Sequence, residues 1–281
     1  MQKVTMGIYN TIAWQVKNQL LSRSRAALIT GTGRCGTSFL ANSLGELHPE
    51  LHVEHEVEPT GIGIQNLSPQ DQRRVIIDAR GRFGKKGIFD KKHRPVLIES
   101  NCFLAMGSEA YMDVWQLCHV IGIIRAWDTC IESMASQTYS THPSFFYADH
   151  DHQRSRRPNP SQLGLMSESE WSKHSRIEKT AWYWSYINNH LMDLEEKYPA
   201  RVRLVSFEQL LADQDEVLND IQAFLEIPIR KLKREVATNS SEELNQRRVS
   251  LKEYSAEEIE SIKRITEATQ TRVTAYFSDK P

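Results

Sequence analysis

The stretch that decides the fold is residues 26–40, AALITGTGRCGTSFL. It begins with a short apolar run and continues through a glycine-rich turn into a pattern in which Leu40, Leu44 and Leu47 recur at helical spacing. We interpret this stretch as a buried strand, a loop and a helix. A glycine-rich loop between a strand and a helix is typical of a phosphate-binding loop.

The loop itself has the spacing Gly31-x4-Gly36 and is followed by the hydroxyl pair Thr37-Ser38. In phosphate-binding loops, backbone N–H groups and the helix N-terminus attract negative oxygens, and glycines let the backbone approach the ligand closely. We therefore expect an anion to bind here. The alternative is a tight strand-to-helix turn that binds nothing.

The charges around the loop argue against a nucleoside triphosphatase. Such an enzyme would carry Lys at the position of Thr37, and an Asp at the end of a neighbouring apolar strand would hold Mg²⁺. Here the strand that ends at Ile124 is followed by Arg125, and the cation of the loop is Arg34. Cations in both places favour direct, metal-free binding of an anion. No arginine stands six positions after Cys35, so the loop does not match that of a cysteine phosphatase.

Other parts of the chain repeat the strand and helix patterns. Further near-continuous apolar runs indicate parallel strands that are covered on both faces, and amphipathic stretches indicate the helices that cover them. The expected strands and helices lie at 95–99, 119–124, 177–194, 201–205, 217–225 and 255–276. This alternation predicts an α/β fold with a central parallel sheet flanked by helices, in a single domain over residues 1–281.

Two segments interrupt the alternation, and we expect both to be irregular. Residues 80–94 are rich in Lys, Arg and Gly, whereas residues 137–173 are polar and contain Phe145-Phe146-Tyr147. Long irregular segments are either solvated surface or binding loops. As binding loops, the basic segment would attract an anionic acceptor, and the aromatic residues would stack on a flat one. The histidines of 137–173 fix no metal geometry, so we expect no metal site.

The composition of the chain limits the classes of partner that we expect it to bind. The 281 residues include 35 Lys and Arg against 36 Asp and Glu, a net charge of −1 that does not favour nucleic acid or anionic lipid. The longest apolar runs are far shorter than the roughly 20 residues that span a bilayer, and we see no secretory signal. We therefore expect a cytoplasmic protein with no membrane association. The 4 cysteines form no CxxC pair, which favours reduced thiols.

Together these features resemble the sulfotransferases that use 3′-phosphoadenosine 5′-phosphosulfate (PAPS), in particular bacterial members. Their first signature, (P/G)-(K/R)-x-G-T-(T/S)-x-(L/F), is matched by residues 33–40, GRCGTSFL. Their second is a strand that ends in Arg with Ser eight residues later, as Arg125 and Ser133 stand here. Softer similarities in the later helices extend the resemblance over residues 26–277. It implies a P-loop-like sulfotransferase fold.

The resemblance also implies roles by position. The residues that would hold the 5′-phosphosulfate are Gly33, Arg34, Cys35, Gly36, Thr37 and Ser38. Arg34 would in addition stabilise charge on the bridging oxygen as the S–O bond breaks. Arg125 and Ser133 would bind the 3′-phosphate, and Arg247 or Arg248 would complete that grip.

Sulfuryl transfer needs a base that takes the proton of the acceptor. In the family this is a Glu or His, either on the segment after the first helix or at the end of the next strand. Glu56 is the first candidate, and His55 and Glu99 follow. Alternation along a strand predicts Glu54 and Glu56 on one face and His55 on the other.

The resemblance thus implies PAPS as donor, 3′-phosphoadenosine 5′-phosphate (PAP) as its product, and a hydroxyl or amine of a small molecule as acceptor. Two other functions stay open. A small-molecule kinase would bind ATP with Mg²⁺, and a non-catalytic binder of the adenosine bisphosphate nucleotide would need Arg34 and Arg125 but no base. Homodimerisation stays open as well.

Overall fold

The computed structural model describes residues 14–56, 64, 67–89, 96–136, 146–147, 157–232 and 249–278. The described strands form one sheet with the order β2-β3-β1-β4-β5, and every neighbouring pair is parallel. The strands are β1 (Arg25–Gly31), β2 (His52–His55), β3 (Leu97–Ser100), β4 (Leu117–Ile124) and β5 (Val202–Ser206). The predicted α/β fold with a central parallel sheet is confirmed.

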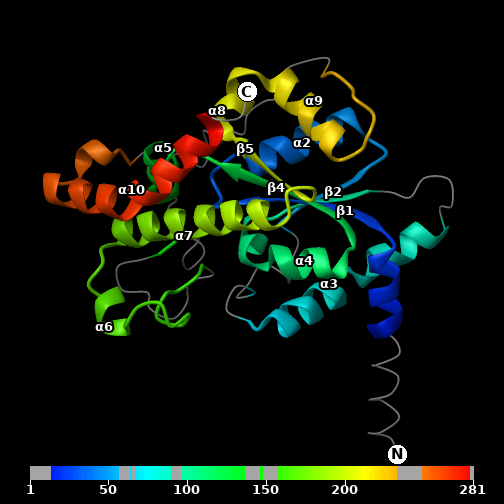
Figure 1. The fold of residues 1–281 in the computed structure, drawn as a ribbon, viewed down its shortest axis with the longest axis horizontal. Coiled ribbons are helices and arrows are strands. Elements are labelled where there is room, and N and C mark those ends of the chain that lie inside the picture. Colours follow the sequence, from blue (N-terminus) through cyan, green and yellow to red (C-terminus); the bar gives the residue numbers. More distant parts are fainter. Residues whose placement is uncertain are drawn as a thin grey trace, which may run out of the picture.

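Helices connect these strands and cover both faces of the sheet (Figure 1). They are α2 (Thr37–Leu47), α3 (Pro69–Phe89), α4 (Ser108–Val114), α5 (Trp127–Ala135), α6 (Glu168–Trp171), α7 (Arg176–Lys197), α8 (Phe207–Ala212), α9 (Gln214–Phe224) and α10 (Ala256–Ser278). Residues 14–22 are also helical, and two short 3-10 segments are η2 (Cys102–Gly107) and η3 (Leu251–Glu253). The helices expected from the amphipathic patterns are present as α7, α9 and α10.

Apolar strand residues alternate between two layers of helices. In β1, Ala27 and Ile29 pack toward α2 and α9, whereas Ala26 and Leu28 pack toward α3 and α4. A strand buried on both faces needs apolar side chains at every position, which is why the strands read as continuous apolar runs. A third cluster joins α5, α7 and α10, and α10 lies along the outer side of α7 (Figure 1).

The prediction of an irregular segment over residues 80–94 is wrong for its first ten residues. Helix α3 continues to Phe89, and Arg80, only 1% exposed, forms an ion pair with Glu99 of β3. One of the glycines that suggested a loop, Gly81, lies against the side chain of Lys17. A Cβ at this position would stand 2.5 Å from that side chain. The remainder of this segment, residues 90–94, lies outside the described residues.

The second segment, residues 137–173, is described at 146–147 and from 157 onward. It contains the short helix α6, which starts with a capping box between Ser167 and Glu170. Phe146 and Tyr147 are 2% and 1% exposed. The idea that these two rings stack on an acceptor is therefore wrong, because both are part of the core; Phe145 and the three histidines lie outside the described residues.

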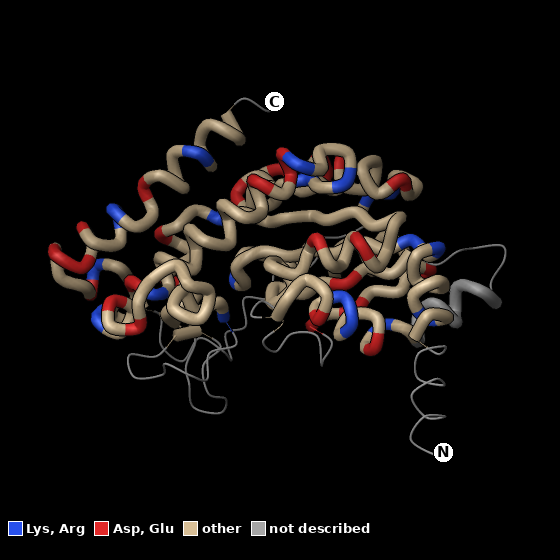
Figure 2. The backbone as a smooth tube through the Cα atoms, turned by 60° about the horizontal axis from the view of Figure 1, so that its bottom comes forward, with Lys and Arg blue, Asp and Glu red and all other residues tan. Residues whose placement is uncertain are grey.

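Charges are interspersed along the outer helices, and the central strands carry few of them (Figure 2). No helix in the described part of the chain is both long enough and apolar enough to cross a bilayer.

Candidate active site

The site lies at the carboxyl ends of β1 and β4, which are neighbours in the sheet. From β1 the chain passes through α2 to β2, at one edge of the sheet. From β4 it passes through α5, α6 and α7 to β5, at the other edge, so the connections from these two neighbouring strands lead in opposite directions. Such a point in an open α/β sheet forms a crevice where ligands bind. The glycine-rich loop after β1 and Arg125 after β4 both lie at this point of the sheet and are in contact.

The loop has a backbone conformation that its glycines permit. Gly33 and Gly36 have φ angles of 79° and 94°, and Arg34 between them has φ 58°, which is costly for a residue with a side chain. Gly36 also lies against the ring of Phe207, where an added Cβ would stand 2.6 Å from a ring atom. Gly36 caps α2 without a side-chain hydrogen bond. The N–H groups of the first turn are therefore available to an anion.

The two arginines that the sequence singled out meet at the loop. The Nη1 of Arg125 donates a hydrogen bond to the backbone carbonyl oxygen of Arg34 at 2.9 Å, and the Nε of Arg34 donates to the hydroxyl of Ser133 at 3.2 Å. Arg125 is held by two further contacts, a hydrogen bond to Thr129 and the ring of Phe207 at 4.7 Å. Loop, strand end and α5 thus bring Arg34, Arg125 and Ser133 together.

The site is electrostatically positive. Burial, and then the neighbouring charge of Arg125, lower the pKa of Arg34. Among the described residues no carboxylate forms an ion pair with either guanidinium. Two adjacent cations without a counter-ion are unfavourable unless an anion binds between them.

The thiols around the loop are packing groups. Cys35, Cys102 and Cys130 are buried, and burial raises the pKa of the first two to about 12 and that of Cys130 to about 11. A Cβ at Gly31 would lie 2.5 Å from the Cys35 sulfur, so the thiol fills the space that this glycine leaves. Cys35 can therefore offer an anion only its backbone N–H.

The first two base candidates both reach the site, although strand alternation predicted otherwise. Strand β2 ends at His55, and Glu56 has φ 46°, which turns the chain out of the strand. The Nε2 of His55 shares a hydrogen bond of 2.9 Å with the hydroxyl of Ser38, and its Nδ1 shares one of 3.1 Å with the hydroxyl of Ser100. The prediction of opposite faces is wrong for this pair because the alternation stops at the turn.

Glu56 lies beside His55 at the same edge. Its Oε1 accepts a hydrogen bond from the thiol of Cys102 at 3.3 Å and lies 3.9 Å from the Nε2 of His55. The side chains of His55 and Glu56 are 44% and 30% exposed. A carboxylate and an imidazole, both accessible, are therefore available at the edge of the loop.

Glu99 is committed to the core. It is fully buried, and Arg80 holds both of its carboxylate oxygens, one of them through Nε at 2.7 Å. The hydroxyl of Tyr111 and the amide of Asn101 also donate to it, at 3.2 and 3.3 Å. Because the carboxylate of Glu99 is buried and its oxygens are occupied in this way, we do not propose Glu99 as a base.

Arg247 and Arg248 lie outside the described residues. The chain is described again from Val249, whose N–H donates to the hydroxyl of Ser136 at 2.9 Å. The N–H of Leu251 donates to Glu132 at 2.7 Å. Glu132 belongs to α5, the helix that carries Ser133, and Ser136 is the C-cap residue of that helix.

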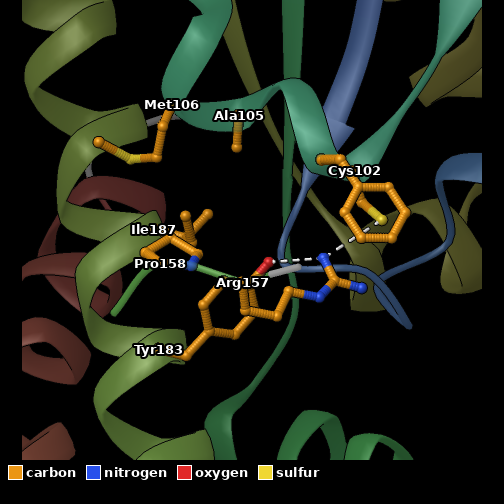
Figure 3. Close-up of a pocket in the computed structure, with 8 residues that line it drawn as sticks. Cys102, Ala105, Met106, Arg157, Pro158, Tyr183 and Ile187 are labelled. Atoms are coloured by element: carbon orange, nitrogen blue, oxygen red, sulfur yellow. Dashed lines mark hydrogen bonds between the residues drawn. The ribbon is translucent and has the colours of Figure 1, made fainter. Parts of the chain in front are cut away.

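Sequence reasoning missed one buried cation beside the loop. Arg157 donates a hydrogen bond to the hydroxyl of Tyr183 at 2.9 Å (Figure 3). This hydroxyl donates to the backbone carbonyl of Thr32, also at 2.9 Å. Nothing in the pattern distinguishes Arg157 from the neighbouring Arg154 and Arg156. Tyr183 lies in the stretch of α7 whose similarity to bacterial sulfotransferases gave a weak signal.

Comparisons with known proteins show the family and the fold of this chain. The family profile described as sulfotransferase domain matches residues 24–279. In structure, the chain is similar to the sulfotransferase domain from the curacin biosynthetic pathway (TM-score 0.51, 12% identity, 89% of this chain and 97% of that one). It is also similar to sulfotransferase STF1 from Mycobacterium tuberculosis H37Rv (TM-score 0.50, 15% identity, 92% and 80%). These two likenesses show the fold.

Mouse sulfotransferase SULT7A1, which was solved in complex with PAP, matches with a TM-score of 0.48 at 13% identity over 95% of this chain and 93% of that one. No protein of curated function matches significantly in sequence.

Proposed function

We propose that this chain, which belongs to the sulfotransferase family, moves a sulfuryl group from PAPS to a hydroxyl or amine of a small-molecule acceptor. The observation that carries the proposal is the meeting of Arg34 and Arg125 at the loop before α2, without a carboxylate ion pair to either among the described residues. PAPS bears phosphate groups at both ends of its ribose. Two cations at one loop suit such a donor, and they would repel a nucleotide complexed with Mg²⁺.

In this proposal the backbone of Gly33 to Ser38 and the N-terminus of α2 bind the 5′-phosphosulfate. Arg125 and Ser133 bind the 3′-phosphate. Arg34, whose backbone forms the loop and whose side chain reaches Ser133, lies between the two. Arg247 or Arg248 completes the 3′-phosphate site, which is supported by the contacts of Val249 and Leu251 with α5.

The donor supplies an activated sulfuryl group. The bond between sulfur and the bridging oxygen breaks as a bond from sulfur to the acceptor oxygen or nitrogen forms. The electron pair stays on the bridging oxygen, which becomes part of the 5′-phosphate of PAP, and the positive loop with Arg34 stabilises this charge. Glu56 takes the proton that the acceptor loses.

Glu56 is proposed as the base because its carboxylate is accessible and lies at the edge of the donor loop. His55, hydrogen-bonded between Ser38 and Ser100, is the second candidate. Removal of a general base costs about 10²- to 10⁴-fold in rate. We expect Glu56→Gln to lower kcat by at least about 100-fold, and His55→Asn to lower it by about 10-fold. The reverse order would make His55 the base.

The activity assay follows the transfer of ³⁵S from labelled PAPS to a panel of small hydroxyl and amine compounds. Labelled product from the wild type, lost in Glu56→Gln and kept in the exposed control Glu46→Gln, supports the proposal. A wild type that binds PAP but yields no product with any acceptor would instead be a non-catalytic binder.

A further inference from the structure

Arg157 is a cation enclosed by aromatic rings. It is 2% exposed, and its guanidinium carbon lies 4.2 Å from the ring centroid of Phe103, 4.5 Å from that of Phe146 and 5.3 Å from that of Tyr183. A buried guanidinium is expensive unless its donors and its charge are matched. The three rings come from η2, the 146–147 segment and α7. A group held from three elements has little freedom to move.

On one side Arg157 touches the donor loop. An ideal Cβ at Gly33 would lie 3.4 Å from its Nη2, so the guanidinium packs against the face of the loop that lacks a side chain. Its hydrogen bond to the Tyr183 hydroxyl continues to the carbonyl oxygen of Thr32. The position of Thr32 and Gly33 is therefore tied to Arg157.

On the other side Arg157 is linked to the proposed base. Its Nη1 donates to the sulfur of Cys102 at 3.5 Å, and the thiol in turn donates to Glu56. Burial works to lower the pKa of Arg157, but Tyr183, Cys102 and Glu56 outweigh burial and raise it. The guanidinium stays charged, and the thiol of Cys102 connects it to the carboxylate of Glu56.

Arg157 also lies beside a contact between residues 146–147 and residues 157–158. The next residue, Pro158, accepts a short hydrogen bond from the hydroxyl of Tyr147, whose ring lies 6.1 Å from that of Tyr183 in an edge-on arrangement. Both described ends of this part of the chain, 146–147 and 157–158, thus converge on the group that contacts the donor loop.

We propose that Arg157 is a positioning residue, which fixes the distance between the donor loop at Thr32–Gly33 and the proton acceptor Glu56. The inference rests on the proposed function, because it assumes that Glu56 takes the proton. A residue of this kind sets the geometry of the reacting groups, so its loss lowers kcat and leaves donor binding nearly unchanged. A misplacement of about 1 Å can cost about 100-fold in rate.

The test compares Arg157→Met, Arg157→Lys and Tyr183→Phe by kcat, KM for PAPS and the calorimetric Kd for PAP. We expect Arg157→Met to lower kcat by about 100-fold with Kd for PAP within about threefold of wild type. Arg157→Lys keeps the positive charge, and its kcat should be about tenfold higher than that of Arg157→Met. Tyr183→Phe should lower kcat by about tenfold relative to wild type. Lys179→Met is the control. It removes a different buried cation, which belongs to α7 and lies over the ring of Trp171, and it should leave kcat per folded molecule unchanged.

A double-mutant cycle separates positioning from general damage. If Arg157 acts through Glu56, then Arg157→Met should cost less than about threefold in the Glu56→Gln background. An equal cost in both backgrounds, or a loss of PAP affinity as large as the loss of kcat, would overturn the inference. Should Arg157→Met fail to fold, the kcat values of Arg157→Lys and Tyr183→Phe test the positioning role instead. Wild-type kcat in both variants would overturn that role. A wild type without sulfuryl transfer would refute the proposed function itself.

Discussion

The guanidinium of Arg125 donates a hydrogen bond to the backbone carbonyl oxygen of Arg34, across 91 positions of sequence, at 2.9 Å. This contact does two things at once. It secures the loop at a residue with an unfavourable backbone conformation, φ 58°, and it brings a second positive charge to the N-terminus of α2. Shape and charge of the anion site therefore depend on the same pair of residues.

Loss of either arginine should weaken nucleotide binding. Hydrogen bonds to charged groups contribute about 1.5–3 kcal/mol, so Arg34→Ala and Arg125→Ala should each raise the Kd for PAP by about 10- to 100-fold, measured by calorimetry. Because Arg125 holds the backbone of Arg34, the double variant should lose less than the product of the two effects. Arg264→Ala, on an exposed position of α10, serves as the control. Wild-type affinity in either single variant would contradict the assignment.

Gly36 should tolerate a side chain much less well than Gly164. Both have positive φ, 94° and 70°, and alanine there costs about 1–2 kcal/mol in backbone strain. A Cβ at Gly36 would in addition meet the Phe207 ring at 2.6 Å, whereas nothing lies within 4 Å of one at Gly164. Chemical denaturation should therefore show a larger loss of stability for Gly36→Ala, with loss of PAP binding. Equal losses would mean that the ring yields freely.

Glu99→Gln should destabilise the fold and spare the chemistry. The neutral amide would leave the buried charge of Arg80 without its counter-ion, which typically costs about 3–5 kcal/mol. Urea unfolding measures this loss. Glu109→Gln, which breaks an exposed pair with Lys197, should cost no more than about 1 kcal/mol. A folded Glu99→Gln enzyme with kcat lowered about 100-fold would return Glu99 to the catalytic candidates.

Stability should fall in alkaline solution because of the buried thiols. Burial raises the pKa of Cys118, as of Cys35 and Cys102, to about 12, whereas an unfolded thiol titrates near about 8.5. The unfolded state therefore loses protons first, so stability is full below about pH 8 and declines as pH rises toward the folded pKa values. Between about pH 8 and pH 10, Cys118→Ala should lose about 2 kcal/mol less than wild type in urea unfolding. Identical pH dependence in both would contradict this.

The sheet could be predicted because its physical cause is visible in the sequence. Strands buried on both faces must be apolar throughout, and residues 26–30 and 119–124 show this directly. Arg34 and Arg125 were identified by the signatures around them, and the carboxyl ends of adjacent parallel strands meet at one edge, which brings the two together.

The rest depends on tertiary contacts that a linear pattern does not contain. Glu99 has the same sequence context as a strand-end catalytic acid, and its buried pairing with Arg80 is what argues for a structural role instead. Glu56 does not lie on the strand face that alternation predicts, because its own backbone adopts a left-handed conformation. The position of Arg157 depends on its packing against the rings of Phe103, Phe146 and Tyr183, which come from three separate segments of the chain.

The most direct test of the central claim is a calorimetric titration of the wild-type protein with PAP in the presence of a chelator, alongside ATP with Mg²⁺. We expect PAP to bind with the same Kd whether the chelator or Mg²⁺ is present, and at least about 100-fold more tightly than ATP with Mg²⁺. Tighter binding of ATP with Mg²⁺, or PAP binding that disappears on chelation, would contradict a site built on Arg34 and Arg125.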